Sequence, residues 1–401
     1  MTNPSNTTAT GAASAGATGA GATTALRSSI LPTYGRYDLT LVRGDGSRVW
    51  DDTGKCYLDC VAGIAVIGLG HCNPVVRAAA EAQLGKLWHV SNLYWTEPML
   101  ELARKLSDRF GGSGAQAFFC NSGAESIEAA LKYARKATGK PGFVALEGSF
   151  HGRTFGALSV TGQPAKRAAF EPGVPGASFV PLNDTDALGQ AVGPDTGCIL
   201  LEPIQGEGGV NPVTQEFMEA AREIATARGA LLILDEIQTG TGRTGSFFAW
   251  EQLDVRPDAL TLAKGLANGL PIGALLVAND ALRGFEPGDH ASTFGGNPVA
   301  AAAACAVLDL IDDALLAHVS AVGERLSTGL RAIPQVSEVR GRGLLLAAEI
   351  DRPGSDAVIA CMQRGLLLGT AGPTALRITP PLTLTADDAD EAVRLLAEAL
   401  A

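Results

Sequence analysis

Apolar and polar residues alternate along the chain with two different periods. Apolar residues three and four positions apart predict amphipathic helices at 74–88, 97–110, 125–139 and 215–229. Short, almost continuous apolar runs predict buried strands at 115–120, 142–148, 197–203, 230–236, 258–265 and 271–279. Strands of this kind, separated by helices, are typical of a parallel sheet covered on both faces. The pattern therefore predicts an α/β fold.

Two further regions have a different pattern and set the expected domain boundaries. Residues 41–63 predict a meander of short strands broken by Gly and Asp, and residues 338–400 predict a smaller α+β unit. We expect a large domain over 74–304 and a small α+β domain formed by 27–73 together with 305–401. Residues 1–26, almost wholly Ala, Gly, Thr, Ser and Asn, are expected to form a disordered tail.

Composition and charge exclude several classes of protein. The net charge of −11 over 401 residues argues against a nucleic acid or an anionic membrane as partner. The longest apolar stretches, such as 299–308, are too short to span a bilayer. Seven cysteines without a C-x-x-C pair indicate reduced thiols in a cytoplasmic protein, and the five histidines form no metal-binding cluster. The same tail has neither the charged nor the apolar region of a secretory signal.

A glycine motif at 240–245, "GTGRTG", matches the G-x-G-x-x-G spacing of dinucleotide-binding loops. Such a loop needs its first glycine where the strand ends, a helix opening at the third, and an acid closing the next strand. Here five residues separate the strand from Gly240, the following "SFFAWEQ" is a poor helix start, and Asp258 precedes the next strand. The context therefore argues against an NAD site.

Asp235 and Lys264 each stand at the end of a predicted strand. Ligands of open parallel sheets bind outside the carboxyl ends of the strands. By itself Asp235 is better explained as a helix cap. Lys264 is the only lysine after Lys166, and its apolar, glycine-rich surroundings are unusual for a surface lysine. A lysine with a depressed pKa is a nucleophile towards carbonyls, and a carboxylate can keep a pyridine nitrogen protonated, so this pair suits pyridoxal phosphate.

"NSGAES" at 121–126 offers a site for the phosphate of such a cofactor. Ser122 and Glu125 have the spacing of a capping box, which by itself means only a well-begun helix. The free N–H groups and positive dipole end of the same helix also bind phosphate, and Gly123 and Ala124 are small enough to let it approach. Beside Lys264 and Asp235, the phosphate interpretation is favoured.

Six segments in order, "NSGAE", "SFHGRT", "EPIQGEGG", "LLILDEIQTGTGRTG", "LAKGLANGLPIGA" and "STFGGNP", resemble the class III aminotransferases. The resemblance runs from about residue 30 to the end, and is closest to the members that act on N2-acetylornithine. It implies a fold-type-I homodimer that binds pyridoxal 5'-phosphate, with a mostly parallel central sheet in the large domain and active sites shared between subunits.

The resemblance also implies a role for individual residues. Lys264 is expected to form the Schiff base with the cofactor and to shuttle the proton. Asp235 is expected to pair with the ring nitrogen, Gln238 to bond the phenolic oxygen, and Phe150 to stack on the ring. The remaining expected cofactor contacts are Ser122, Gly123, Ala124, His151 and Ile237, with Thr293 coming from the partner subunit. The expected substrate contacts are Tyr34, Ile64, Arg153, Glu207, Ser292 and Arg377.

Glu207 addresses a physical problem of the expected reaction. The donor presents a terminal amine, whereas 2-oxoglutarate presents a carboxylate next to its keto group. The resemblance implies that Glu207 pairs with Arg377 and releases it when the keto acid arrives. An apolar Ile64 favours an acylated donor, since free ornithine's charged α-amine would lack a polar contact there. Ile67 departs from the asparagine usual in the family.

The sequence thus predicts transfer of the δ-amino group of N2-acetylornithine to 2-oxoglutarate in arginine biosynthesis, by a ping-pong reaction. The alternatives are a sibling aminotransferase acting on ornithine, succinyl-diaminopimelate or 4-aminobutyrate, and a non-catalytic protein that binds pyridoxal phosphate. The second alternative would need neither Arg153 nor Arg377.

Overall fold

A computed structural model describes residues 29–110, 114–281 and 284–401. The chain divides into two compact units at Thr40 and Leu41. The described part of the first unit, 29–40, has turns and extended backbone, with the Arg36 guanidinium 5.2 Å from the centre of the Tyr34 ring. The predicted tail, 1–26, lies outside the described residues.

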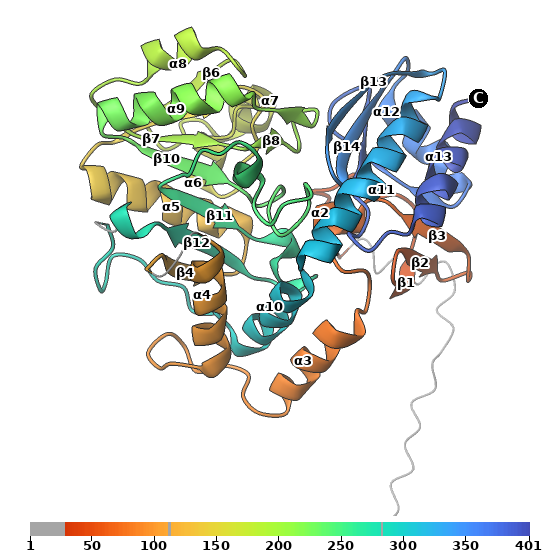
Figure 1. Ribbon diagram of the computed structural model, residues 1–401, viewed down its shortest axis with the longest axis horizontal. Helices are drawn as coiled ribbons and strands as arrows, with labels where there is room; N and C mark the ends of the chain where they lie inside the picture. Colours follow the sequence, from red (N-terminus) through yellow and green to blue (C-terminus); the bar gives the residue numbers. More distant parts are fainter. Residues whose placement is uncertain (1–28, 111–113, 282–283) are drawn as a thin grey trace, which may run out of the picture. The chain divides into compact units, whose positions relative to one another are not determined.

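A seven-stranded sheet forms the centre of the second unit (Figure 1). The strands lie in the order β4, β12, β11, β10, β7, β5 and β6. Their bounds are β4 Gln116–Cys120, β12 Gly273–Val277, β11 Ala259–Leu262, β10 Leu231–Asp235, β7 Thr196–Leu201, β5 Gly142–Leu146 and β6 Ala177–Val180. The mostly parallel sheet expected from the sequence is confirmed.

One strand runs against the others. β12 pairs antiparallel with both β11 and β4. Only a short connection containing the 3₁₀ turn η3 (Lys264–Ala267) joins β11 to β12, with no crossover helix. A parallel neighbour requires such a crossover, so the chain returns in the opposite direction. The short connection is also the segment that carries Lys264.

Helices cover both faces of this sheet because its strands are apolar on both sides. In β10, Ile233 packs with one core cluster beside α5 (Gly123–Thr138), while Leu232 and Leu234 belong to the cluster that includes α9 (Gln215–Arg228). Successive strand side chains point to opposite faces, so a continuous apolar run is what a two-sided burial requires. The other helices of this region are α3 Pro74–Leu84, α4 Glu97–Arg109, α6 Phe155–Ser159, α7 Pro164–Arg167, α8 Thr185–Ala191 and α10 Pro298–Leu310.

The predicted helices begin and end at recognisable capping residues. The Ser122 hydroxyl accepts the N–H of Glu125 at 3.2 Å, and α5 ends at Gly139 in the left-handed region (φ 70°). α9 begins at Thr214 and ends in the same way at Gly229. α3 ends at Leu84, earlier than the predicted 88, because Gly85 terminates it.

The capping box predicted at Ser122 is only half right. The Glu125 carboxylate accepts the N–H of Asn121 at 2.8 Å and the Ser122 hydroxyl at 3.1 Å, rather than the N–H of Ser122. The reciprocal bond is displaced by one residue, because the chain enters the helix with Asn121 inside the turn. The start of α5 is stabilised all the same.

Strands from before α3 and from the C-terminal part of the chain together build two smaller sheets around a separate core (Figure 1). The predicted meander is confirmed as β1 Leu41–Asp45, β2 Arg48–Asp51 and β3 Cys56–Asp59, and β3 pairs with β15. The other sheet is β13-β14-β17-β16. The remaining elements of this region are α2 Ala62–Ala65, α11 Asp313–Arg331, β13 Val336–Arg342, β14 Leu345–Ile350, α12 Gly354–Gln363, β15 Leu366–Leu367, β16 Gly369–Thr370, β17 Ala375–Ile378 and α13 Ala386–Leu400. Short elements elsewhere in the chain are β8 Ile204–Gln205, β9 Asn211–Pro212, η1 Ala168–Phe170, η2 Ala249–Gln252 and η4 Asn279–Ala281.

The expected domain boundaries near residues 73 and 305 stay a prediction. Within the described ranges no helix is long and apolar enough to cross a membrane. All seven cysteines are described and none forms a disulfide.

Candidate functional site

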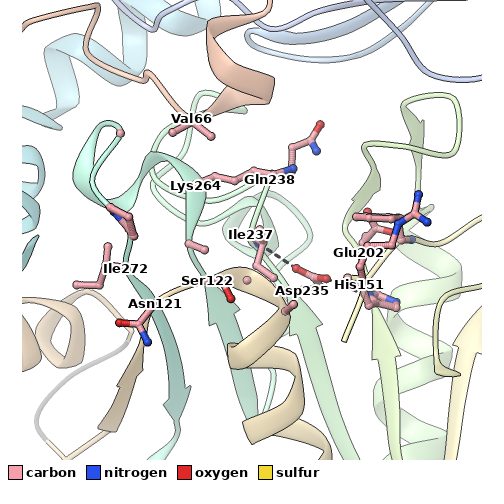
Figure 2. A pocket seen from close by; sticks show the side chains of 18 of the residues that line it. Val66, Asn121, Ser122, His151, Glu202, Asp235, Ile237, Gln238, Lys264 and Ile272 are labelled. Atoms are coloured by element: carbon pink, nitrogen blue, oxygen red, sulfur yellow. Dashed lines mark hydrogen bonds and ion pairs between the residues drawn. The ribbon is translucent and has the colours of Figure 1, made fainter. Parts of the chain in front are cut away.

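A cavity of about 400 Å³ opens at one edge of the seven-stranded sheet (Figure 2). The segments that line it follow β4, β5, β7, β10 and β11, so it lies at the carboxyl ends of the parallel strands, where open α/β sheets bind ligands. Its walls are Val66, Asn121, Ser122, Gly123, Ala124, Phe150, His151, Gly152, Arg153, Glu202, Asp235, Ile237, Gln238, Ala263, Lys264, Gly269, Leu270, Pro271 and Ile272.

Asp235 is fixed at the floor of this cavity. It ends β10 and is 3% exposed. One carboxylate oxygen lies 2.7 Å from Nδ1 of His151, and the other accepts the N–H of Ile237 at 3.0 Å and the hydroxyl of Thr261 at 3.4 Å. These contacts hold the carboxylate in one orientation. Its role as a partner of a ring nitrogen remains a prediction.

His151 is the buried partner of Asp235. Burial lowers the pKa of His151, but the hydrogen bond to Asp235 and its negative charge outweigh burial and raise the pKa overall. Nε2 of His151 is buried and has no hydrogen-bond partner among the described residues. The hydrogen bond to Asp235 therefore favours the cationic form of His151.

Lys264 projects into the cavity from the next strand. β10 and β11 are parallel, with Asp235 opposite Thr261, so Lys264 follows only three residues after that partner. Desolvation lowers the pKa of Lys264 to about 8, against an attraction by Glu207 that raises it. The backbone of Lys264 is in the left-handed region (φ 39°), which costs a non-glycine residue of order 1 kcal/mol or more. Strained backbone of this kind often marks a functional residue.

The start of α5 forms a shallow cradle on the opposite wall. A Cβ on Gly123 would come within 2.8 Å of the Ile237 side chain, and one on Gly152 would come as close to Ala124. The first N–H groups of a helix have no partners within the helix, and its dipole favours an anion. The small residues and these free donors suit a phosphate group.

Glu207 and Arg377 form an ion pair beside the cavity. Nη1 of Arg377 also donates to the carbonyl of Gly206 at 2.8 Å, and lies 3.4 Å from the amide oxygen of Gln238. Desolvation raises the pKa of Glu207, but the positive charges of Arg377 and Lys264 outweigh this effect and lower the pKa overall. The carboxylate therefore stays charged. The pairing expected from the sequence is therefore present.

The other predicted residues are placed as follows. Arg153 is exposed at the cavity wall, with its guanidinium 5.5 Å from the centre of the Phe150 ring. The Ser292 hydroxyl accepts a hydrogen bond from the side-chain amide of Asn121 at 3.2 Å. Five predicted residues of the second unit are not among those that line the cavity, namely Ile64, Glu207, Ser292, Thr293 and Arg377. Tyr34 belongs to the first unit.

Glu202 is a cavity residue that the sequence reasoning missed. It follows β7, and its carboxylate accepts the N–H of Phe150 at 2.9 Å and that of Gly206 at 3.3 Å. Burial raises the pKa of Glu202 to about 7. The signal that identified Asp235, an acid directly after an apolar strand, also applies to Glu202 and could have found it.

The residues that line the cavity fit pyridoxal phosphate. An amine with a lowered pKa suits an aldehyde, a buried carboxylate suits a protonated ring nitrogen, and a glycine-containing helix start suits a phosphate. Among the described residues, no group of three or more His, Cys, Asp or Glu side chains could hold a metal ion.

Comparison with known proteins agrees with this chemistry. The family model for aminotransferase class III matches residues 32–400. An acetylornithine aminotransferase of Corynebacterium efficiens is 48% identical over 93% of this chain and 95% of its own length. That of Caldanaerobacter subterraneus subsp. tengcongensis is 46% identical over 92% of this chain and 97% of its own length.

Solved structures give the same result for the fold. The ornithine aminotransferase of Toxoplasma gondii superposes with a TM-score of 0.89 at 32% identity, covering 94% of this chain and 93% of that one. The N-acetylornithine aminotransferase of Stenotrophomonas maltophilia superposes with a TM-score of 0.79 at 38% identity, covering 92% and 96%.

Proposed function

Because the chain belongs to the class III aminotransferases, we propose that it transfers the δ-amino group of N2-acetylornithine to 2-oxoglutarate. The products are N-acetylglutamate 5-semialdehyde and glutamate, in the arginine pathway of the cytoplasm. The observation that carries the proposal is the 48% identity, over nearly the whole of both chains, to a protein named for this donor.

Pyridoxal 5'-phosphate is the cofactor of this enzyme. When bound, it supplies an aldehyde that condenses with amines and a ring that withdraws electrons from the reacting carbon. Asp235 would hold the ring nitrogen, Phe150 would cover the ring, and Gln238 would bond the phenolic oxygen. The phosphate would lie on the start of α5, at Ser122 and the cradle beyond it, joined by Thr293 of the second subunit. His151 and Ile237 would complete the ring contacts.

Lys264 is the residue that acts on the reacting atoms. Its Nζ would take up the proton from the substrate carbon that bears the amine and would give it back at the cofactor carbon joined to the same nitrogen. With a pKa near 8 this amine is partly neutral at physiological pH, whereas an ordinary lysine is almost wholly charged. The low polarity that lowers the pKa also keeps competing water away from the reaction.

Glu207 and Arg377 allow one site to accept two different substrates. While the ion pair is closed, the cation is neutralised and the terminal amine of the donor can enter. The keto acid brings a carboxylate next to its reacting carbon, and a planar guanidinium binds such a group in bidentate fashion. Glu207 would then release Arg377. The carboxylate at the far end of either substrate would lie by Arg153.

Donor choice depends on a segment that leads into the cavity. Ile64 is 44% exposed with φ 67°, and lies two residues before Val66, which lines the cavity. An apolar side chain there accepts an acylated amine and leaves a free α-ammonium without a polar partner. Tyr34 and Ser292 are further proposed contacts of the donor.

A second copy of the chain would complete the site. Large apolar side chains that are more than half exposed gather where the segment 88–95 meets the segment 292–297. Asn92 donates to the carbonyls of Ser292 at 3.1 Å and Gly295 at 2.9 Å, which holds the two segments together. Exposed apolar patches of this kind mark interfaces, and Thr293 lies within this one. The patch consists of Trp88, Leu93, Tyr94, Trp95 and Phe294.

The donor panel tests the proposed function. We expect kcat/KM for N2-acetylornithine to exceed that for ornithine, succinyl-diaminopimelate and 4-aminobutyrate, each with 2-oxoglutarate as acceptor. Ile64→Tyr should move the ratio of acetylornithine to ornithine by about tenfold towards ornithine, since one added polar contact is worth that much. A wild-type preference for ornithine would contradict the proposal.

Glu207→Ala tests the exchange of the ion pair. Without the carboxylate, Arg377 stays available, so the half-reaction with glutamate should improve relative to the half-reaction with acetylornithine. Each half-reaction is followed separately by the absorbance of the bound cofactor, with Glu324→Ala, an exposed residue of α11, as control. Equal changes in both half-reactions would show that Glu207 has no such role.

The mass of the full chain in solution tests the shared site. Sedimentation should give twice the chain mass of 41.1 kDa. Trp95→Asp should weaken the dimer and lower activity together, whereas Ile359→Asp, an exposed apolar residue of α12, should change neither. A monomer with full activity would contradict the proposal that two subunits share each active site.

A further inference from the structure

Lys166 is a cation near the cavity that the proposed reaction does not use. It lies in α7 (Pro164–Arg167), and its Nζ is 4.7 Å from the centre of the Phe150 ring. Arg153 reaches the same ring, at 5.5 Å. Phe150 and Arg153 line the cavity, and Lys166 lies beside it at the ring that the two cations share.

Lys166 lacks a counter-ion although it is partly buried. Its ammonium forms no ion pair with any carboxylate of the described residues, whereas the adjacent Arg167 is 3.8 Å from the Glu171 carboxylate. A cation at the face of an aromatic ring recovers only part of the hydration it loses. Lys166 would therefore gain from any carboxylate that enters the cavity.

The surrounding charges point to the same conclusion. Burial lowers the pKa of Lys166, and repulsion by Arg153 and Arg377 lowers it further. The opposing attraction comes from Glu207 and Glu202, which already hold other partners: Glu207 pairs with Arg377, and Glu202 accepts two backbone N–H groups. Neither carboxylate is therefore free to form an ion pair with Lys166.

We infer that Lys166 is a second cationic contact, beside Arg153, for the substrate carboxylate farthest from the reacting carbon. This rests on the proposed function, because that reaction gives both substrates such a carboxylate. The donor reacts at its terminal amine, so its only carboxylate lies at the far end. In 2-oxoglutarate one carboxylate adjoins the keto group and would bind Arg377, and the other lies at the opposite end of the molecule. Lys166 and Arg153 lie at the same ring, that of Phe150, so a carboxylate held by Arg153 would lie near Lys166 as well.

The alternative is that Lys166 only supports the ring of Phe150 by packing against it. In that case the loss of Lys166 would lower kcat/KM equally for every substrate, because the Phe150 ring would cover the cofactor in the reaction of each one. A contact with the far carboxylate would affect only substrates that possess one. Two acceptors separate these possibilities: 2-oxoglutarate, and pyruvate, which lacks the far carboxylate.

The experiment compares Lys166→Gln and Lys166→Arg with the wild-type holoenzyme on both acceptors. Lys166→Gln should raise KM for 2-oxoglutarate by about tenfold, as for the loss of one charge-assisted contact, and change kcat less than twofold. The kcat/KM for pyruvate should stay within twofold. Lys166→Arg should restore the KM for 2-oxoglutarate, because it keeps the charge.

Arg167→Gln is the matched control, since this neighbouring side chain lies over the Phe179 ring at 4.1 Å and donates to the carbonyl of Thr161. It should leave both acceptors unchanged. An unchanged KM for 2-oxoglutarate in Lys166→Gln, or an equal loss with pyruvate, would overturn the inference. If the wild type transfers an amino group to neither acceptor, the proposed function itself fails, which is a different result.

Discussion

The parallel pairing of β10 with β11 is the constraint on which the rest of the site depends. Each residue of these strands is buried, so a slip in register would expose apolar side chains or bury polar ones. The register places Asp235 opposite Thr261 and thus brings Asp235 and Lys264 to the same cavity wall. A site for pyridoxal phosphate needs both the carboxylate and the amine, and neither is sufficient alone. Packing of the sheet is what brings them together.

Much of this could be predicted because the signals are local. A carboxylate after a buried strand marked Asp235, and an isolated lysine in an apolar, glycine-rich setting marked Lys264. Family resemblance identified the pairing of Glu207 with Arg377, which join segments 170 residues apart in the sequence. The reversal of β12 was less visible, because an apolar run has the same pattern in either direction. The surroundings of Lys166 could not be predicted, since they depend on how α7 lies against Phe150.

The glycine motif at 240–245 shows why spacing alone misleads. Its loop is buried, and Gly242 and Gly245 have φ of 87° and 92°, values that favour glycine. The motif's arginine, Arg243, donates to the carbonyls of Leu344 and Pro380, so the loop is tied to segments that flank the strand of Arg377. Glu236, just before it, accepts the N–H groups of Ala249 and Trp250. The glycines thus serve a packed junction rather than a nucleotide.

Desolvation at the carboxyl ends of the strands makes Lys264 a partly neutral nucleophile near physiological pH. The most direct measurement is the rate at which the cofactor-free enzyme captures pyridoxal phosphate, followed by absorbance as a function of pH. Only the neutral amine reacts, so the rate should rise with pH, reach half its maximum near pH 8, the lowered pKa of Lys264, and level off above it. A rate that kept rising towards the pKa of an ordinary lysine, about 10.4, would contradict the account.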